Sequence, residues 1–485
     1  MEEKIVTRAD CDVVIAKCIS SDKFEVVNFK VKPFEDKERE YYKPDCVLEV
    51  SAKVAKAKNI ARFRFFLKKF AKPASQSPKA SERELFFYEV LLPMLRQGLD
   101  GYETDFVAQY LHGKIGRMMI LEDMSLKFFT LAKKSNPHML DRFHLSLALK
   151  AIAKLHAGSL RFEGTQQGSA TPKMFDPSAL LSQELYWVKP STPQPPGPLQ
   201  SSLKGLEALL KEFKLKADLA GLLQLTFDIM RPQTTYRNVL GHGDLHTKNL
   251  LFKYDKTKIP TDCVLLNFGF CRYFLPAYDV LTLIFRSTTR LFRQHYFTYL
   301  IEYYHDCLHN ELIKQEGLHI DQFLPLEDFK QSINFLMPAI KLQTVLHLED
   351  FGAKPGFYKL LQKNAALYEE YLYEDKSPFM LDLIKKDPIF KESMGEALEE
   401  LLETVKFPQV SRENCYEVLE TYLQTTLYEL KGFALAALGD AEETLGLTME
   451  VSDGSKEGAI EKVNYLVQCG ANRLFTVLKH VEEAE

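Results

Sequence analysis

The stretch from Val239 to Phe252, VLGHGDLHTKNLLF, holds the residues whose types and spacing best suit a chemical step. Within it, His242, Asp244 and Asn249 form the pattern H-x-D-x-x-x-x-N between apolar flanks. Phosphoryl transfer uses such a pair, because an aspartate orients or deprotonates the acceptor hydroxyl and an asparagine oxygen five residues later binds magnesium on the phosphates. The pattern predicts Asp244 as the catalytic carboxylate and Asn249 as a metal ligand. We expect His242 to be a structural histidine of this loop rather than a proton carrier.

A second candidate metal ligand, Asn267, follows eighteen residues after Asn249. It lies in the apolar stretch Val264–Phe270, VLLNFGF, which predicts a strand that ends at Asn267-Phe268-Gly269. Kinase-like sites place a metal-binding aspartate at the end of such a strand. The amide of Asn267 carries no charge, and magnesium prefers carboxylates where it bridges phosphates. We therefore expect this site to bind magnesium with reduced affinity.

The first 120 residues favour strands and one helix. A stripe of Leu85, Tyr88, Leu92 and Leu95 predicts a helix over Glu82–Leu95, with Ser81 as its N-cap and a possible kink or early end at Pro93. Strands are predicted from runs rich in β-branched and aromatic residues at Asp12–Ile19, Phe24–Val31, Ala61–Phe70 and Arg117–Leu121.

The remainder of the chain reads as mainly helical, apart from a stiff loop predicted by five prolines between Pro190 and Pro198. His156 is expected in the core, and Asp279 is expected to cap the N-terminus of a helix. The predicted helices are Asp141–Leu160, Asp279–Tyr304, Pro325–Glu349, Glu396–Lys406 and Asn414–Leu438.

The order of these elements predicts an α+β, two-lobed fold. We expect a nucleotide-binding N-terminal lobe with a small antiparallel sheet and one key helix over residues 1–122, a helical lobe with the catalytic loop over 123–385, and a C-terminal helical extension over 386–485. A cleft between two such lobes commonly houses a nucleotide. Taken alone, H-x-D-x-x-x-x-N also fits a capped turn. Together with the second strand, the Phe-Gly pair and this order of elements, it favours a kinase-like fold.

The composition fits an ordinary globular protein: 485 residues, 46% hydrophobic and 26% charged, with a formal net charge of −4. This charge favours neither nucleic acid nor an anionic membrane as a partner. The eight cysteines never fall at C-x-x-C spacing, which is typical of reduced thiols rather than a zinc site or a disulfide framework. Met1–Ala9 is charged and lacks an apolar signal segment, so we expect a cytoplasmic protein.

Glycine is absent from Met1 to Gln97. The loop that would cover nucleotide phosphates, around Glu38–Val47, therefore has no residue that freely adopts positive φ and lets the backbone approach a phosphate closely. We therefore expect the first fifth of the chain to contain an unorthodox phosphate-binding loop, or none.

Six segments in order between Lys68 and Gly352 resemble the ecdysteroid kinase-like group of the choline kinase and aminoglycoside phosphotransferase superfamily. They are FFLKK at Phe65–Lys69, ERELFFYEVLLPML at Glu82–Leu95, MMILEDM at Met118–Met124, AIAKLHAGS at Ala151–Ser159, HGDLHTKNLLF at His242–Phe252 and PAYDVLTLIF at Pro276–Phe285. The resemblance implies a protein-kinase-like fold that uses ATP and magnesium to phosphorylate a hydroxyl, in the founding case on moulting steroids.

The resemblance also implies roles for single residues. Lys68 would be the strand lysine that pairs with nucleotide phosphates, although Lys69 competes with it because strand alternation puts only one of them in the cleft. Glu84 would hold that lysine. The segment Leu121–Met124, with Glu122, Asp123 and Met124, would be the hinge whose main chain binds adenine. In this family the aspartate at position 279 also braces the catalytic loop.

Two hypotheses follow. In the first, the protein is a small-molecule kinase in which Asp244 is the base, Asn249 and Asn267 hold magnesium, and Lys68 with Glu84 positions the phosphates. In the second, it is a pseudokinase that binds a nucleotide or a small apolar ligand without transfer and works as a binding or scaffolding module. The acceptor would be a bulky apolar alcohol such as a steroid, bound by the helical lobe at 190–198, the helix from Asp279 or the segment Phe335–Phe351. The oligomeric state stays open.

Overall fold

The computed structural model describes residues 5–34, 46–54, 59–70, 78–132, 139–165, 181, 197–314 and 318–405. Residues 1–405 form one compact unit, and residues 406–485 form another. The predicted helix Asn414–Leu438 and nearly all of the predicted 190–198 loop lie outside the described residues, as does most of the glycine-free segment Glu38–Val47.

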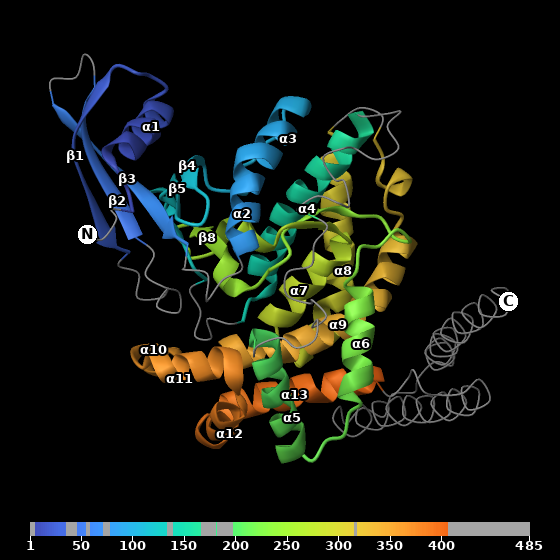
Figure 1. The fold of residues 1–485 in the computed structure, drawn as a ribbon. Helices are drawn as coiled ribbons and strands as arrows, with labels where there is room; N and C mark the ends of the chain where they lie inside the picture. The colour runs from blue at the N-terminus through green and yellow to red at the C-terminus, as the bar shows by residue number, and fades with distance from the viewer. Residues whose placement is uncertain are drawn as a thin grey trace, which may run out of the picture. The chain divides into compact units, whose positions relative to one another are not determined.

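A five-stranded antiparallel sheet forms the N-terminal part of the chain (Figure 1). Its strands, in the order β1-β2-β3-β5-β4, are β1 (Phe24–Pro33), β2 (Cys46–Val54), β3 (Ile60–Lys69), β5 (Met118–Glu122) and β4 (Tyr110–Lys114). The strands predicted at Phe24–Val31, Ala61–Phe70 and Arg117–Leu121 are confirmed.

The strand predicted at Asp12–Ile19 is wrong, because these residues belong to helix α1 (Arg8–Ile19). A capping box starts this helix, in which the Thr7 side chain accepts from the Asp10 main chain and the Asp10 side chain accepts from the Thr7 main chain. Cys11, Val14 and Ile15 then lie on one helical face and pack against the sheet. The local cap and this stripe outweigh the β-branched composition.

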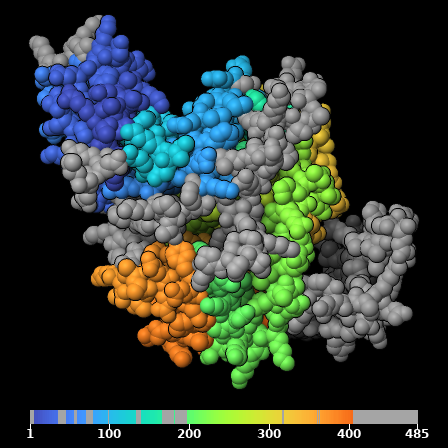
Figure 2. Space-filling view, in the orientation of Figure 1, coloured from blue at the N-terminus to red at the C-terminus, as the bar shows by residue number. Residues whose placement is uncertain are grey.

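One long helical segment follows the third strand. It consists of α2 (Pro78–Phe86), a π-helical stretch η2 (Phe87–Leu91) and α3 (Leu92–Gly98). The helix predicted at Glu82–Leu95 is therefore confirmed, but it begins at Pro78, so Ser81 lies inside the helix and is not its N-cap. Pro93 does not end it, because the proline lies in the first turn of α3, after the wider π-helical turn. In Figure 2 this segment and the β4–β5 hairpin lie beside the first strands. Residues 198–229 and 355–386 lie below them in the same view.

Short strands around the helical lobe carry the loops with the chemical motifs. The predicted catalytic loop, His242–Asn249, lies between β7 (Val239–Gly241) and β8 (Leu250–Tyr254). Asn267 follows β9 (Pro260–Leu265). In addition, Val107 forms a bridge to Leu265 at the end of β9, so this hairpin is tied to the chain just before β4. The strands are β6 (Phe129–Thr130), β7 (Val239–Gly241), β8 (Leu250–Tyr254), β9 (Pro260–Leu265) and β10 (Arg272–Phe274), with pairing β10-β7 and β6-β8-β9.

Helices make up most of the described residues after residue 140. They are α4 (Arg142–Thr165), α5 (Pro198–Glu212), α6 (Leu219–Ile229), α7 (Pro276–Ser287), α8 (Arg290–Leu312), α9 (Leu326–Phe351), α10 (Pro355–Lys363), α11 (Ala365–Glu369), α12 (Ser377–Lys386) and α13 (Pro388–Val405). Helices are confirmed at Asp141–Leu160, Pro325–Glu349 and the described part of Glu396–Lys406. The single helix predicted at Asp279–Tyr304 is two helices, because Thr289 leaves helical geometry and caps Phe292 at the start of α8.

The structure confirms the α+β fold class, with an antiparallel N-terminal sheet and a mainly helical remainder. The two predicted domain boundaries, at 122/123 and 385/386, stay predictions. Within the described residues, no helix is both long enough and apolar enough to cross a membrane.

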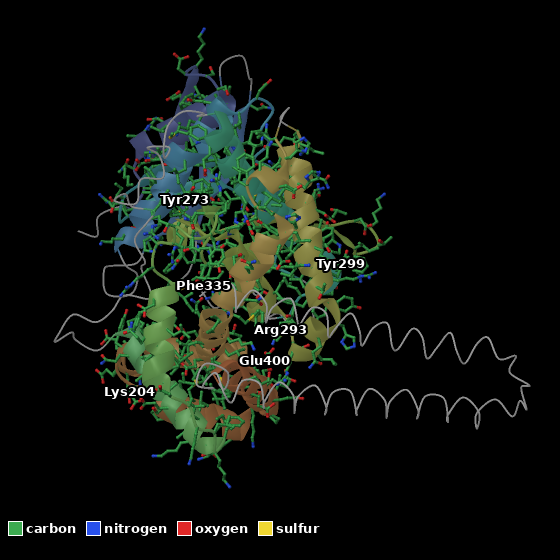
Figure 3. All side chains as sticks on the ribbon, turned by 90° about the vertical axis from the view of Figure 1, so that its right-hand side faces the viewer. Lys204, Tyr273, Arg293, Tyr299, Phe335 and Glu400 are labelled. Carbon is green, nitrogen blue, oxygen red and sulfur yellow. The ribbon has the colours of Figure 1, made fainter. Side chains whose placement is uncertain are left out.

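Two arginines on α8 join it to α13 in different surroundings. Figure 3 labels one of them, Arg293, and its partner Glu400. Arg293 and Glu400 form an ion pair with side chains only 8% and 12% exposed, and Arg293 also donates to the Thr288 carbonyl at 2.5 Å. Arg290 pairs with Glu403 at 2.6 Å, with side chains 25% and 52% exposed. Because both arginines lie on α8, a comparison of the two ion pairs tests how burial changes the contribution of an ion pair to the free energy of unfolding.

We predict that Arg293→Met lowers the free energy of unfolding by about 3–5 kcal/mol, because it removes the buried partner of Glu400. Arg290→Met is expected to cost less than about 1 kcal/mol, since water screens that pair. Urea denaturation of both variants measures the difference. Equal losses in the two variants would contradict the packing of α8 on α13 described above.

Candidate active site

The catalytic loop is fixed to the helical lobe through a buried carboxylate. Asp279 on α7 accepts hydrogen bonds from the main-chain nitrogens of His242, at 2.5 Å, and Gly243, at 2.8 Å. His156 of α4 lies 3.1 Å from the same carboxylate. Burial alone would raise the pKa of Asp279, but the bonds from His156 and Gly243 hold this pKa below its ordinary value. Asp279 therefore braces the loop; the predicted helix-capping role is wrong, because α7 is capped at Leu275.

Glycine is required next to this brace. Gly243 has φ +81°, and a Cβ there would lie 2.0 Å from the Phe270 carbonyl oxygen. The resulting turn directs Asp244 away from the strand β7 that precedes it.

His242 and His156 have structural surroundings. The His242 Nε2 lies 2.7 Å from the Leu266 carbonyl and its Nδ1 accepts from the Asp244 main chain. Burial lowers the pKa of His242, so the ring is neutral in a fixed tautomer. His156 is fully buried and its Nδ1 contacts the Tyr304 hydroxyl at 2.6 Å. Both geometries agree with the structural roles expected from the sequence.

Asp244 is held by groups from two elements. Its Oδ1 accepts from Arg286 Nη1 of α7 at 2.9 Å, and its Oδ2 lies 3.2 Å from Asn249 Nδ2. Burial opposes ionisation, but the nearby His246 ring and the Arg286 guanidinium hold the pKa of Asp244 well below its ordinary range. The carboxylate is therefore ionised at neutral pH.

Sequence reasoning missed Arg286. Its position offers one signal: it lies seven residues, or two helical turns, after Asp279, and so on the same face of α7. A helix that places Asp279 under the loop therefore also presents Arg286 to it. Arg286 in turn reaches Gln343 Oε1 of α9 at 3.3 Å.

Of the two candidate lysines, Lys68 is the one that meets Glu84. The Lys68 Nζ lies 2.9 and 2.7 Å from the two Glu84 carboxylate oxygens, with side chains 16% and 3% exposed. On β3, Phe65 and Leu67 pack with α1 on one face of the sheet, so alternation turns Lys68 to the opposite face and Lys69 to the α1 side. The structure thus brings Lys68 and Glu84 together, and leaves Lys69 out.

A chain of side-chain hydrogen bonds runs from Lys68 to Asp244. Lys68 Nζ donates to Asn267 Oδ1 at 2.8 Å, Asn267 Nδ2 donates to Asn249 Oδ1, and Asn249 Nδ2 donates to the Asp244 main-chain oxygen at 2.6 Å. The ends set the direction of this chain, because an ammonium group only donates and an ionised carboxylate only accepts. Each amide must therefore point its oxygen toward Lys68 and its nitrogen toward Asp244.

Packing around Phe268 holds Asn267 in place. Asn267 has left-handed geometry at φ 65°, ψ 64°, and the buried Phe268 ring after it stacks on Phe87, with ring centroids 3.8 Å apart. The His242 ring also lies beside Phe268, with ring centroids 4.7 Å apart. A Cβ on Gly269 would come within 3.1 Å of the Ala80 carbonyl oxygen. The Asn-Phe-Gly turn is thus wedged between the long helical segment and the catalytic loop.

The two candidate metal ligands do not form a fitting site for a resident magnesium ion. Both are neutral amides, and both of their oxygens already accept a hydrogen bond inside the chain from Lys68 to Asp244. Magnesium in proteins is typically held through carboxylates and substrate phosphates. In the described part of the chain, no group of three or more His, Cys, Asp or Glu residues could hold a metal ion.

The predicted hinge residues use their side chains for structure. Asp123 is buried, pairs with Arg64 at 2.9 Å and caps the turn at Ser125. Glu122 pairs with Lys127 at 2.5 Å, and Met124 is buried. Only main-chain groups of this segment remain for recognition of an adenine, and that role stays a prediction.

One face of α9 covers the side of the catalytic loop away from the sheet. Gln343, His347 and Phe351 recur every four residues along it. The His347 and Phe351 rings lie 5.1 Å from the His246 ring, and Gln343 contacts Arg286. This part of the predicted acceptor segment Phe335–Phe351 is therefore next to Asp244, and its role in binding an acceptor stays a prediction.

A strand lysine paired with a helix glutamate, beside a loop that carries Asp244 and Asn249, defines a protein-kinase-like fold and site. The chain belongs to the ecdysteroid kinase-like family, whose sequence model matches residues 46–317. No curated protein matches the chain.

Two solved phosphotransferase structures are similar to the chain at low levels. Macrolide 2'-phosphotransferase MphH from Brachybacterium faecium is 13% identical, with a TM-score of 0.31, and the match covers 75% of this chain and 96% of that one. A type I macrolide 2'-phosphotransferase is 14% identical, with a TM-score of 0.28, over 76% of this chain and 96% of that one.

We predict that magnesium alone leaves the melting temperature of the wild-type protein unchanged, whereas Asn267→Asp gains a saturable increase. The new carboxylate supplies the missing charge and removes the donor to Asn249, so both oxygens become available; stabilisation is about 1.4 kcal/mol at ten times the dissociation constant. Thermal unfolding against magnesium concentration measures this. Asn267→Ala, which breaks the same bonds without adding charge, is the control. An equal magnesium response in wild type would show that the amide site does bind the ion.

Proposed function

We propose that the protein is an ATP-dependent small-molecule kinase that transfers a phosphoryl group to a hydroxyl. The observation that carries this proposal is the Lys68–Glu84 pair, with both carboxylate oxygens within 2.9 Å of the ammonium nitrogen, joined through side chains to the loop of Asp244. A lysine fixed in this way is the group that positions nucleotide phosphates in kinase-like enzymes. Membership of the ecdysteroid kinase-like family supports the same reaction class.

In this proposal Asp244 orients the acceptor. Arg286 and Asn249 occupy one lone pair on each Asp244 oxygen, and the carboxylate has further acceptor sites for a hydroxyl. Its low pKa makes it a weak base, but phosphoryl transfer passes through a loose transition state in which the attacking oxygen needs positioning more than early deprotonation. The hydroxyl proton passes to Asp244 late in the transfer.

Lys68 supplies positive charge to the phosphates. To reach them it exchanges its bond with Asn267 Oδ1 for a phosphate oxygen and keeps its pair with Glu84. Magnesium, which the described residues do not suit as a resident ion, would enter as part of the nucleotide substrate and be held mainly by phosphate oxygens.

The acceptor in this proposal is a bulky apolar alcohol such as an ecdysteroid. The family name and the aromatic face of α9 beside His246 support it. We further propose that the protein acts on free small molecules and does not bind nucleic acid or a membrane, in line with its formal net charge of −4.

The second candidate function is that of a pseudokinase, a nucleotide- or ligand-binding module without transfer. One specific observation favours it: the hydrogen bonds that link Lys68, Asn267 and Asn249 satisfy the groups that would otherwise meet a metal–phosphate unit. The two functions differ in whether nucleotide binding is followed by release of ADP.

We predict that Lys68→Ala weakens ATP binding by about 10- to 150-fold, the equivalent of a charge-assisted hydrogen bond of about 1.5–3 kcal/mol. Lys69→Ala on the opposite face of the same strand is the control and should bind ATP as the wild type does. Isothermal titration of ATP into the three proteins measures both values. An equal loss in the two variants would contradict the assignment of Lys68.

Turnover tests the role of Asp244. With a hydroxylated acceptor found by screening sterols and other alcohols for magnesium-dependent ADP release, Asp244→Asn should lower turnover by about 100- to 10,000-fold while ATP binding stays within about threefold of wild type. Asp255→Asn, in an exposed turn, is the control. Wild-type protein that binds ATP but releases no ADP with any acceptor would favour the pseudokinase, and full turnover in Asp244→Asn would remove Asp244 from the mechanism.

A further inference from the structure

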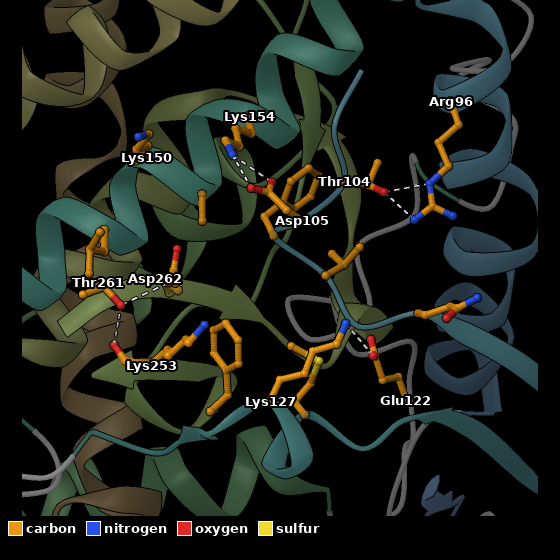
Figure 4. Close-up of a pocket in the computed structure, with 18 residues that line it drawn as sticks. Arg96, Thr104, Asp105, Glu122, Lys127, Lys150, Lys154, Lys253, Thr261 and Asp262 are labelled. Carbon is orange, nitrogen blue, oxygen red and sulfur yellow. Dashed lines mark hydrogen bonds and ion pairs between the residues drawn. The ribbon is translucent and has the colours of Figure 1, made fainter. Parts of the chain in front are cut away.

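A hollow of about 620 Å³ has Glu122 and Met124 of the predicted hinge among its lining residues (Figure 4). This volume is in the range of small-molecule pockets, roughly 300–1,000 Å³. Its walls come from the end of α3 and the chain before β4, from the hinge and the turn after it, from α4, and from the β8–β9 hairpin.

The hollow is separate from the candidate active site. Lys68, Glu84, Asp244, Asn249 and Asn267 are all absent from its lining. It shares with the predicted nucleotide site only the hinge, through the side chains of Glu122 and Met124. A ligand here would therefore be a second ligand, and it goes beyond the proposed kinase function.

The lining of the hollow also includes buried apolar residues. Phe106, Val107, Met124, Ala151 and Cys263 are buried and present carbon and sulfur atoms to it. Such a surface favours an apolar molecular body, because it removes apolar area from water on both partners.

The charged residues of the lining leave an excess of positive charge. Five are basic and three are acidic, a difference of two. Two acids are already neutralised, Asp105 by Lys154 at 2.7 Å and Glu122 by Lys127 at 2.5 Å. The third, Asp262, accepts from the Thr261 hydroxyl at 3.1 Å. The basic residues are Arg96, Lys127, Lys150, Lys154 and Lys253.

Lys150 and Lys253 are the two lysines of the lining that remain after these pairings, and Asp262 lies across from Lys253 on the neighbouring strand β9. Among the described residues, neither of them forms an ion pair. Figure 4 shows that Lys253 extends from the β8–β9 hairpin into the space between the lining residues, while Lys150 belongs to α4 on another wall. Two cations over an apolar floor are complementary to one anionic group attached to an apolar body.

We propose that this hollow binds an organic anion, whose apolar body rests on Phe106 and Met124 and whose carboxylate, sulfonate or phosphate group pairs with Lys150 and Lys253. The charge-assisted pairing gives selectivity for anions, and the buried floor selects against small inorganic ions, which gain nothing from apolar contact. Because Glu122 and Met124 belong to the predicted hinge, the ligand contacts the hinge through their side chains.

Anilinonaphthalene sulfonate, a fluorescent aromatic anion, is a suitable probe. The wild-type protein should bind it at one saturable site, and Lys150→Gln/Lys253→Gln should bind it at least about tenfold more weakly, as expected for the loss of about 1.4 kcal/mol or more. Lys211→Gln/Lys216→Gln, which removes the same charge from residues outside the hollow, is the matched control. Unchanged thermal unfolding of both double variants excludes binding to partly unfolded protein.

Three further measurements test where the probe binds and whether the protein recognises both its anionic group and its apolar body. Saturating ATP should leave the probe bound, and the uncharged analogue phenylnaphthylamine should bind at least about tenfold more weakly than the sulfonate. Ala151→Leu, which fills the floor without changing charge, should also weaken the probe. Displacement by ATP, equal affinity of the two double variants, or equal affinity for the uncharged analogue would each overturn the proposal.

Discussion

The contact between the Lys68 ammonium group and Asn267 is the interaction on which the site depends. Lys68 is held from the helix side by the buried Glu84, and it donates across to the turn that follows β9. Because a lysine can only donate, it fixes the orientation of the Asn267 amide, which fixes that of Asn249 and so the donor that reaches Asp244. These hydrogen bonds thus link the N-terminal sheet to the catalytic loop. An aspartate at position 267 could pair with Lys68 but could not donate to Asn249.

Packing and hydrogen bonds hold both ends of this series of hydrogen bonds in place. Phe268 stacks on Phe87 directly after Asn267, and Asp279 holds the main chain of the catalytic loop just before Asp244. The same helix α7 supplies Arg286 to Asp244. The arrangement is consistent with a kinase-like phosphotransferase family. However, the neutral amide of Asn267 takes the place of a charged metal ligand. One site therefore contains a lysine held by Glu84, the ionised Asp244, and two amides, Asn249 and Asn267, that hydrogen-bond to each other.

Much of the site was predictable because its parts are local. Asp244 and Asn249 are five residues apart on one loop, and the apolar run before Asn267 marks its strand. The choice between Lys68 and Lys69 was open, since it depends on which face of β3 packs with α1, a contact between distant segments. Arg286 was missed for the same reason: forty-two residues separate it from Asp244, and only the docking of α7 brings them together. The first helix was mistaken for a strand because Val and Ile content outweighed the Thr7–Asp10 capping box in the sequence reading.

The central claim is that the amide chain satisfies the site without a resident divalent ion. Calorimetric titration of ATP into the wild-type protein, once with excess magnesium and once with a chelator, tests it most directly. If the protein contributes no charged metal ligand, the two affinities should agree within about threefold, or less than about 1 kcal/mol. Binding that becomes more than about tenfold tighter with magnesium would contradict the account, because it would require Asn249 and Asn267 to release their mutual bond and coordinate the ion.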